Sequence, residues 1–198
     1  MGSLPARLTV VEWQALAGRS RSAWDPVSSA KLVAVAAFAA FLAWESSTGE
    51  RWVPLLDSAN LAFHEAGHLF YGILGRTMGL YGGTLGQLTF PVVCAAIFAF
   101  RREAVSLAVC VIWFGENLCN IARYAADARA QELPLVGGGE HDWTNILSRW
   151  HALASDLRVG RTFHGLGIAA MAIAAGWLAL LWYRGRPGDA ERVPRGLG

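Results

Sequence analysis

The sequence predicts an all-α polytopic membrane protein with four to five transmembrane helices. Only 16% of its 198 residues are charged, whereas a soluble domain is usually about a quarter charged. Apolar residues make up 54% of the chain, and they gather in runs close to the length that crosses a bilayer. The net charge of +2 is too small for a phosphate-binding surface. We therefore expect a lipid bilayer as the surroundings and no nucleic-acid partner.

The N-terminal part of the chain predicts a tail followed by the first span. Residues 1–26 are polar to mixed and are expected to form a tail or a short interfacial helix. A single membrane domain is expected over residues 27–183, and its first apolar run, Val27 to Trp44, is long enough for one span. A helix is expected next at about 58–74, with Asp57 or Ser58 as its N-cap.

Glycines dominate the segment after that helix. The stretch from Gly72 to Gly86 predicts a connector, and the alternation from Thr84 to Pro91 favours a short strand, a short hairpin or a re-entrant loop over a helix. Residues 91–100 and 104–126 then predict a helical hairpin, whose first arm is short for a full span.

The longest polar region covers residues 127–162 and includes the Gly-Gly-Gly-Glu-His-Asp-Trp segment, which predicts a loop at 137–143. A final span is expected at about 163–182, and the Pro- and Gly-containing segment 184–198 is expected to be a disordered tail.

The second expected helix carries a metal-binding pattern. His64-Glu65-Ala66-Gly67-His68 matches H-E-x-x-H, and residues four apart share one face of a helix, so both imidazoles can reach one ion. The expected ion is Zn²⁺, which activates a water molecule, with Glu65 as the general base. Ionisable side chains within a membrane helix favour a functional reading over a structural one. The alternative is a polar trio that only joins helices by hydrogen bonds.

A catalytic zinc needs a third protein ligand. His141 and Asp142 follow three glycines, and either can complete the site while the other orients its neighbour. Asp142 can instead be only the N-cap of a following helix. His164, Glu116 and Asp127 are weaker candidates.

These motifs resemble those of the site-2 protease family of intramembrane zinc metalloproteases. The resemblance covers roughly residues 57–147 and rests on the H-E-x-x-H motif, a Gly-rich hairpin and a later Asp at a helix start. It implies zinc ligation by His64, His68 and Asp142, with Glu65 as the catalytic base. Trp143 follows Asp142 where the family has Gly, and the family's Asn-Pro is absent. The chain would therefore be a divergent, minimal member.

We therefore expect a zinc metalloprotease that cleaves transmembrane or membrane-associated peptides with a metal-activated water. The substrate would add as a strand near Gly82 to Phe90, and an amide of Asn117 or Asn120 would either stabilise an oxyanion or join two helices. The expected location is a cell membrane or bacterial-type inner membrane, with several spans. Two alternatives remain: a non-catalytic membrane scaffold with a structural metal, and a haem-binding membrane redox protein.

Overall fold

The computed structural model describes residues 23–48, 53–135 and 140–186, and within these ranges it contains helices and no strand. The expected all-α fold is confirmed. The elements in chain order are α2 (Ser29–Ser47), α3 (Pro54–Gly72), α4 (Arg76–Phe100), α5 (Ala104–Ala126), α6 (Asp142–Arg149), the 3₁₀ turn η1 (Leu153–Ser155) and α7 (Asp156–Arg184).

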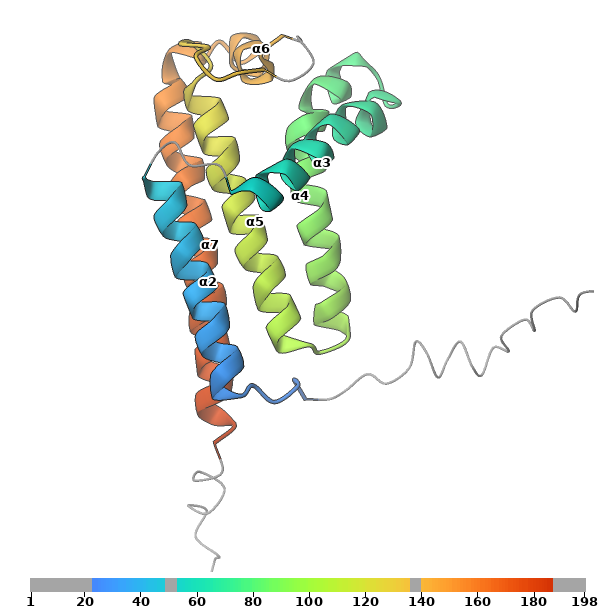
Figure 1. Ribbon diagram of the computed structural model, residues 1–198. Coiled ribbons are helices and arrows are strands. Elements are labelled where there is room, and N and C mark those ends of the chain that lie inside the picture. Colours follow the sequence, from blue (N-terminus) through green and yellow to red (C-terminus); the bar gives the residue numbers. More distant parts are fainter. Residues whose placement is uncertain (1–22, 49–52, 136–139, 187–198) are drawn as a thin grey trace, which may run out of the picture.

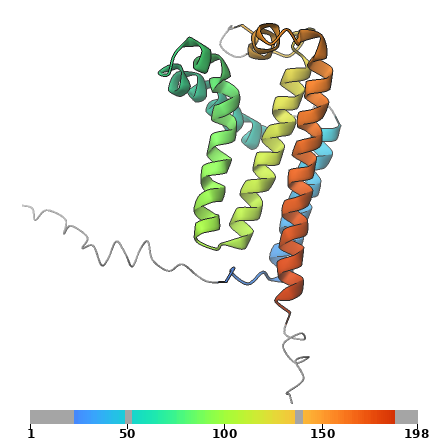
Figure 2. The same ribbon diagram turned by 180° about the vertical axis from the view of Figure 1, so that it is seen from behind.

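Among the described residues, four helical segments are long and apolar enough to cross a membrane: α2, α4, α5 and the η1–α7 segment Leu153–Arg184. They alternate in direction, so the start of α2, the α4–α5 turn and the end of α7 share one end of the bundle (Figures 1 and 2). Two contacts join that end: the Asp25 N–H donates to the Arg102 carbonyl at 2.9 Å, and the Trp182 indole N–H donates to the Ser29 hydroxyl at 3.1 Å. The α3–α4 turn and α6 lie at the opposite end.

The core of the bundle lies among α2, α5 and α7. Small residues let these helices approach closely, as is usual for helices packed in a membrane: a Cβ added to Gly115 of α5 would lie 2.6 Å from the Gly167 carbonyl of α7. The buried side chains of this core are Val35, Ala39, Leu42, Ala104, Ala108, Ile112, Cys119, Met171, Ala174 and Leu178.

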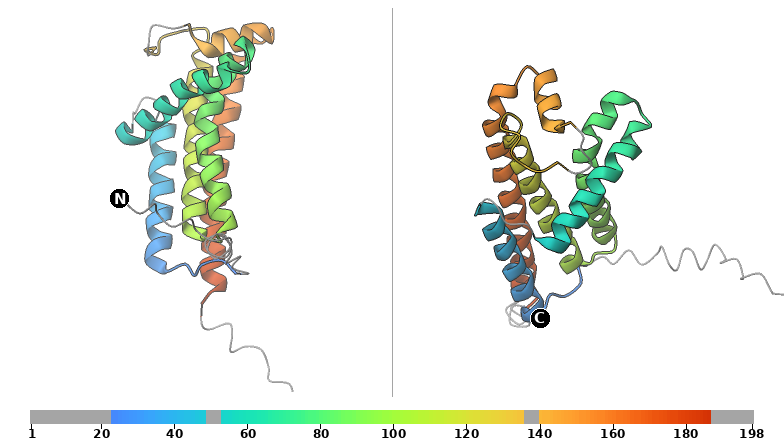
Figure 3. Two further views of the ribbon diagram at one scale, coloured as in Figure 1. Left: turned by 90° about the vertical axis from the view of Figure 1, so that its right-hand side faces the viewer. Right: turned by 45° about the horizontal axis from the view of Figure 1, so that its top comes forward.

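Helix α3, which carries the H-E-x-x-H motif, is not among the four candidate spans, because polar residues interrupt its apolar sequence. It lies obliquely across the bundle and rises towards the α6 end (Figure 3). The structure therefore does not support the expectation that the motif lies in a membrane-spanning helix. The helix also begins at Pro54 rather than near residue 58, with Val53 as its N-cap, because proline suits the first turn of a helix.

The predicted strand, or re-entrant loop, at residues 84–91 is also wrong, since this segment lies inside the 25-residue helix α4. The turn before it is short and ends at Gly75, whose φ of 113° favours glycine. Glycines four apart, as in Gly79-x-x-x-Gly83 and Gly82-x-x-x-Gly86, allow close helix packing in membrane proteins. They build the α3–α4 contact rather than breaking α4.

Two further boundaries shift. Asp142, expected at the end of a loop, is the first residue of α6, and α7 begins at Asp156 rather than near 163. Residues 1–22 of the predicted tail 1–26, residues 187–198 of the predicted tail 184–198, and residues 137–139 of the predicted loop 137–143 lie outside the described residues.

Candidate metal centre

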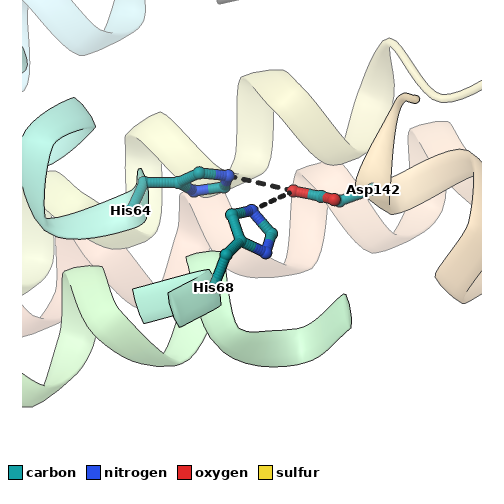
Figure 4. A group of neighbouring side chains, drawn as sticks. All are labelled: His64, His68 and Asp142. Carbon is teal, nitrogen blue, oxygen red and sulfur yellow. Dashed lines mark hydrogen bonds and ion pairs between the residues drawn. The ribbon is translucent and has the colours of Figure 1, made fainter. Parts of the chain in front are cut away.

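Three side chains from two helices converge at the α6 end of the bundle. His64 and His68 lie one turn apart on α3, and both direct Nε2 at the same carboxylate oxygen, Oδ2 of Asp142 on α6 (Figure 4). The two N–O distances are 2.9 Å from His64 and 3.1 Å from His68. The three possible ligand atoms lie within 4.8 Å of one another, a spacing that suits a single metal ion.

The other nitrogen of each ring, Nδ1, already has a hydrogen-bond partner. Nδ1 of His68 lies 2.8 Å from the Gly79 carbonyl, and Nδ1 of His64 lies 3.1 Å from the side-chain oxygen of Gln87. Both partners are acceptors, so both Nδ1 atoms carry the hydrogen and both Nε2 atoms present lone pairs. Because ionised Asp142 also offers only lone pairs, these three groups repel one another unless a cation lies between them. Metal-binding histidines show the same arrangement, with the second nitrogen held by an acceptor.

Helix α4 forms the floor of this centre with three residues spaced four apart: Gly79, Gly83 and Gln87. Such residues lie on one helical face. Gly79 and Gln87 each contact one imidazole by a hydrogen bond. A Cβ added to Gly83, which lies between them, would be 2.6 Å from Nε2 of His68 and would also collide with His64. Glycine at position 83 therefore keeps the space between the rings open.

Asp142 is positioned by α5. Its backbone N–H donates to the Tyr124 hydroxyl at 3.1 Å. The rest of α6 is fixed by Trp143, Ile146 and Leu147, which are buried against Ile121 and Ala125 of α5 and Ala128 just beyond it. The third member of the cluster therefore comes from a helix separated from α3 by two spans.

His141, the other candidate for the third ligand, does not join the cluster. It is the N-cap of α6, and its Nδ1 accepts the Thr144 N–H at 3.3 Å. Its ring lies against Tyr124, and its Nε2 is 3.4 Å from Asp127. The alternative that Asp142 is only the helix cap is therefore wrong.

The weaker candidates also lie elsewhere. Asp127 accepts the backbone N–H groups of Glu132 and Leu133. Glu116 accepts the Asn60 amide at 2.7 Å, and His164 lines a second cavity of about 360 Å³.

Hydrogen bonding in the centre shifts the proton affinities of its members. The bond to Asp142 raises the pKa of His68 to about 9, against the opposing effect of burial. Burial alone would raise the pKa of Asp142, but its bonds to His64 and His68 outweigh burial and lower it. At neutral pH a proton on His68 therefore supplies the positive charge, which a bound metal ion would have to displace.

A cavity of about 450 Å³ opens beside the three ligands and includes the exposed Glu65 in its wall. The polar wall also contains Arg123 and Asn120. Asn117 is fully buried and donates to the Trp113 carbonyl, and it is not among the residues that line this cavity.

The centre lies far from the α4–α5 turn. Gly83, at the floor of the site, precedes Arg101 on the same helix, and the rise of 1.5 Å per residue puts them about 27 Å apart. A hydrocarbon layer is about 30 Å thick. If the α4–α5 turn marks one boundary of that layer, the ligands lie near the other boundary.

Comparisons with family models, curated proteins and solved structures find no match for this chain. Sequence reasoning missed Gly79, Gly83, Gln87 and Tyr124. The overlapping glycine pairs of α4 were the available signal for the first two. Nothing in the local sequence pointed to Tyr124.

Proposed function

We propose that this protein is a zinc-dependent metalloprotease of the membrane surface, which hydrolyses peptide bonds of membrane or membrane-associated substrates. The observation that carries the proposal is the convergence of three lone-pair donors beside a cavity that also contains Glu65. His64, His68 and Asp142 would hold the ion. Three protein ligands and open space beside them are typical of a catalytic zinc rather than a structural one.

Zinc, when bound, polarises the scissile carbonyl and makes a water molecule more acidic. Glu65 takes one proton from the water whose oxygen adds to the carbonyl carbon. As the C–N bond breaks, Glu65 passes that proton to the departing amine nitrogen, so no net proton is consumed. Glu65 suits this role because its carboxylate is exposed in the cavity wall beside both histidines.

The cavity favours an extended peptide segment with apolar side chains. Its wall contains Leu61 of α3 and Leu80 of α4, together with Leu133, Pro134 and Leu135 of the segment after α5. The earlier idea that a substrate adds as a strand at Gly82–Phe90 is not supported, because this segment is helical and offers no strand edge. We infer that the substrate is bound mainly by side-chain contacts.

We further propose a multi-pass protein of a cell membrane or bacterial-type inner membrane. The four candidate spans support this location. The resemblance to site-2 proteases extends to Asp142, which stands at a helix start and meets the two histidines. As a member of that family it would be divergent and minimal, because Trp143 follows Asp142 where the family has Gly and the family's Asn-Pro is absent.

The test replaces Glu65 by Gln in the purified, detergent-solubilised protein. Cleavage of a membrane peptide should fall by about 10²- to 10⁴-fold, the usual contribution of a general base, while bound zinc stays at the wild-type level by elemental analysis. Glu140→Gln is the matched control, because Glu140 also lines the cavity but bonds to Asn145. Zinc without any cleavage by the wild type would favour the non-catalytic scaffold, and a Soret band would favour the haem protein.

A further inference from the structure

A continuous chain of polar side chains connects His64 to the beginning of its own helix. Gln87 Oε1 contacts His64 Nδ1 at 3.1 Å. The Gln87 amide nitrogen donates to Asn120 Oδ1 at 3.4 Å, and the Asn120 amide nitrogen donates to Asp57 Oδ1 at 2.9 Å. The chain therefore runs through α4 and α5 and returns to α3.

Asp57 sets the direction of every bond in this chain. Its Oδ2 accepts the Val53 N–H at 2.5 Å, so the carboxylate is fixed by the first turn of α3. An ionised carboxylate can only accept hydrogen bonds. Asn120 must therefore turn its NH₂ group towards Asp57, which leaves its oxygen facing Gln87.

The same reasoning applies to the amide of Gln87. Gln87 must turn its NH₂ group towards the Asn120 oxygen, which leaves Oε1 facing His64. An amide oxygen accepts, so His64 must carry its hydrogen on Nδ1 and direct the lone pair of Nε2 at Asp142. Asp57 thus determines, through Asn120 and Gln87, which nitrogen of the His64 ring faces the metal.

Burial makes this orientation hard to reverse. Asp57, His64 and Gln87 have exposed fractions of 4%, 7% and 4%. Flipping the Gln87 amide would put like groups face to face where little water can reach them, and an unsatisfied buried polar group costs about 1–3 kcal/mol.

We propose that Asp57, Asn120 and Gln87 are positioning residues that select the metal-binding tautomer of His64. None of them belongs to the H-E-x-x-H motif. His68 obtains the same orientation from a backbone carbonyl, that of Gly79, so the two ligands are oriented by independent means. This inference rests on the metal of the proposed function but not on the peptidase reaction.

The experiment measures zinc affinity by competition with a chromophoric chelator for the full-length protein and three variants. Gln87→Met, which removes both hydrogen bonds, should weaken zinc binding ten- to a hundredfold, as for other residues that orient metal ligands. Gln87→Glu keeps an oxygen towards His64 but faces the Asn120 oxygen with a second one, and it should bind zinc more tightly than Gln87→Met because His64 keeps its acceptor. Thr89→Val is the matched control, because Thr89 lies on the same helix and bonds to Tyr71 and Leu85.

A second measurement needs no variant at Gln87. In zinc-loaded protein labelled with ¹⁵N-histidine, the ring nitrogens of His64, assigned with His64→Gln, should show a protonated Nδ1 and a metal-bound Nε2. Coordination through Nδ1 would overturn the proposal, as would equal zinc affinity of wild type and Gln87→Met.

The outcomes separate this inference from the proposed function. A wild type that binds no zinc overturns both. Zinc binding that depends on Gln87 but is accompanied by no peptide cleavage supports the positioning chain and removes the peptidase.

Discussion

At the scale of single residues, the centre is defined by which atoms carry hydrogen. His64 and His68 each bind an acceptor through Nδ1, and Asp142 has no hydrogen to offer when ionised. The three groups face one another across a space that a side chain at position 83 would fill. A cation is therefore the natural occupant, and its identity depends on pH and on the metal supply.

The neighbours His141 and Asp142 can be separated by substitution. Asp142→Asn removes the charge of a proposed ligand. Loss of a residue that only orients a ligand already weakens metal binding by at least about tenfold, so we expect this variant to lose more than that. His141→Asn should leave zinc binding near the wild-type value, because asparagine is a favoured N-cap and can keep the start of α6 intact. Zinc titration of both variants checks this, and a larger loss in the His141 variant would assign the third ligand to His141.

Zinc affinity should also rise with pH. The pKa of His68 is raised to about 9 in the metal-free centre, so below that pH a proton must leave before zinc binds. For one released proton the apparent affinity changes about tenfold per pH unit, which predicts an increase of about a hundredfold from pH 6 to pH 8. The His68–Asp142 contact itself stabilises the metal-free protein fully below pH 6.5 and is lost as pH rises through about 9. A pH-independent zinc affinity would show that His68 is not protonated in the free site.

At the scale of elements, the close packing of α3 against α4 brings the two imidazoles into contact with α4. A Cβ added to Gly86 would lie 2.8 Å from the Gly67 Cα, and one added to Gly82 would lie 2.5 Å from the Gly67 carbonyl oxygen. The two backbones therefore touch at the level of the metal ligands. That contact brings the Gly79 carbonyl and Gln87 within reach of the rings.

Substituting Gly67 by alanine should separate the two helices. The new methyl group would collide with the Gly82 backbone, and such overpacking costs typically about 1–3 kcal/mol. We expect a lower thermal unfolding midpoint and a loss of zinc binding. Gly72→Ala is the control on the same helix, since its Cβ would meet only the Gly79 Cα at 3.9 Å. Equal destabilisation by both variants would mean that close packing at Gly67 has no special role.

At the scale of the whole molecule, the two ends of the bundle carry different groups of residues. The end formed by the start of α2, the α4–α5 turn and the end of α7 carries Lys31, Arg101, Arg102 and Arg184. The opposite end holds α6, the metal centre and its cavity. A substrate would therefore reach the ligands near one membrane surface.

Cysteine labelling in sealed vesicles tests this arrangement. After replacement of Cys94, Cys110 and Cys119, a single cysteine at Glu132 should react with a membrane-impermeant maleimide from one side, and one at Arg101 from the other. Both positions are exposed, and α5 is the single span between them, so one crossing puts them on opposite sides. Labelling of both from the same side would contradict the assignment of α4 and α5 as spans.

The sequence by itself determined the helical class, the first span, the bounds of α5 and the pair His64 and His68 with Glu65 between them. These features are local, because apolar runs decide membrane crossing and a spacing of four decides a shared helical face. It misjudged α4, because glycine and β-branched residues favour a turn or strand in isolation, whereas a partner helix makes close packing favourable. The same polar residues that mark the motif also keep α3 out of the set of spans.

Only the tertiary structure shows that Asp142, and not His141, meets the two histidines, because both are good ligands by type and adjacent in the chain. The choice depends on Tyr124, which holds the Asp142 N–H, and on the capping bond that occupies His141. Gln87 and its links to Asn120 and Asp57 were equally hidden, since they join residues 23 to 63 positions apart. Contacts across such separations arise from the packing of α3, α4 and α5, and no local pattern encodes them.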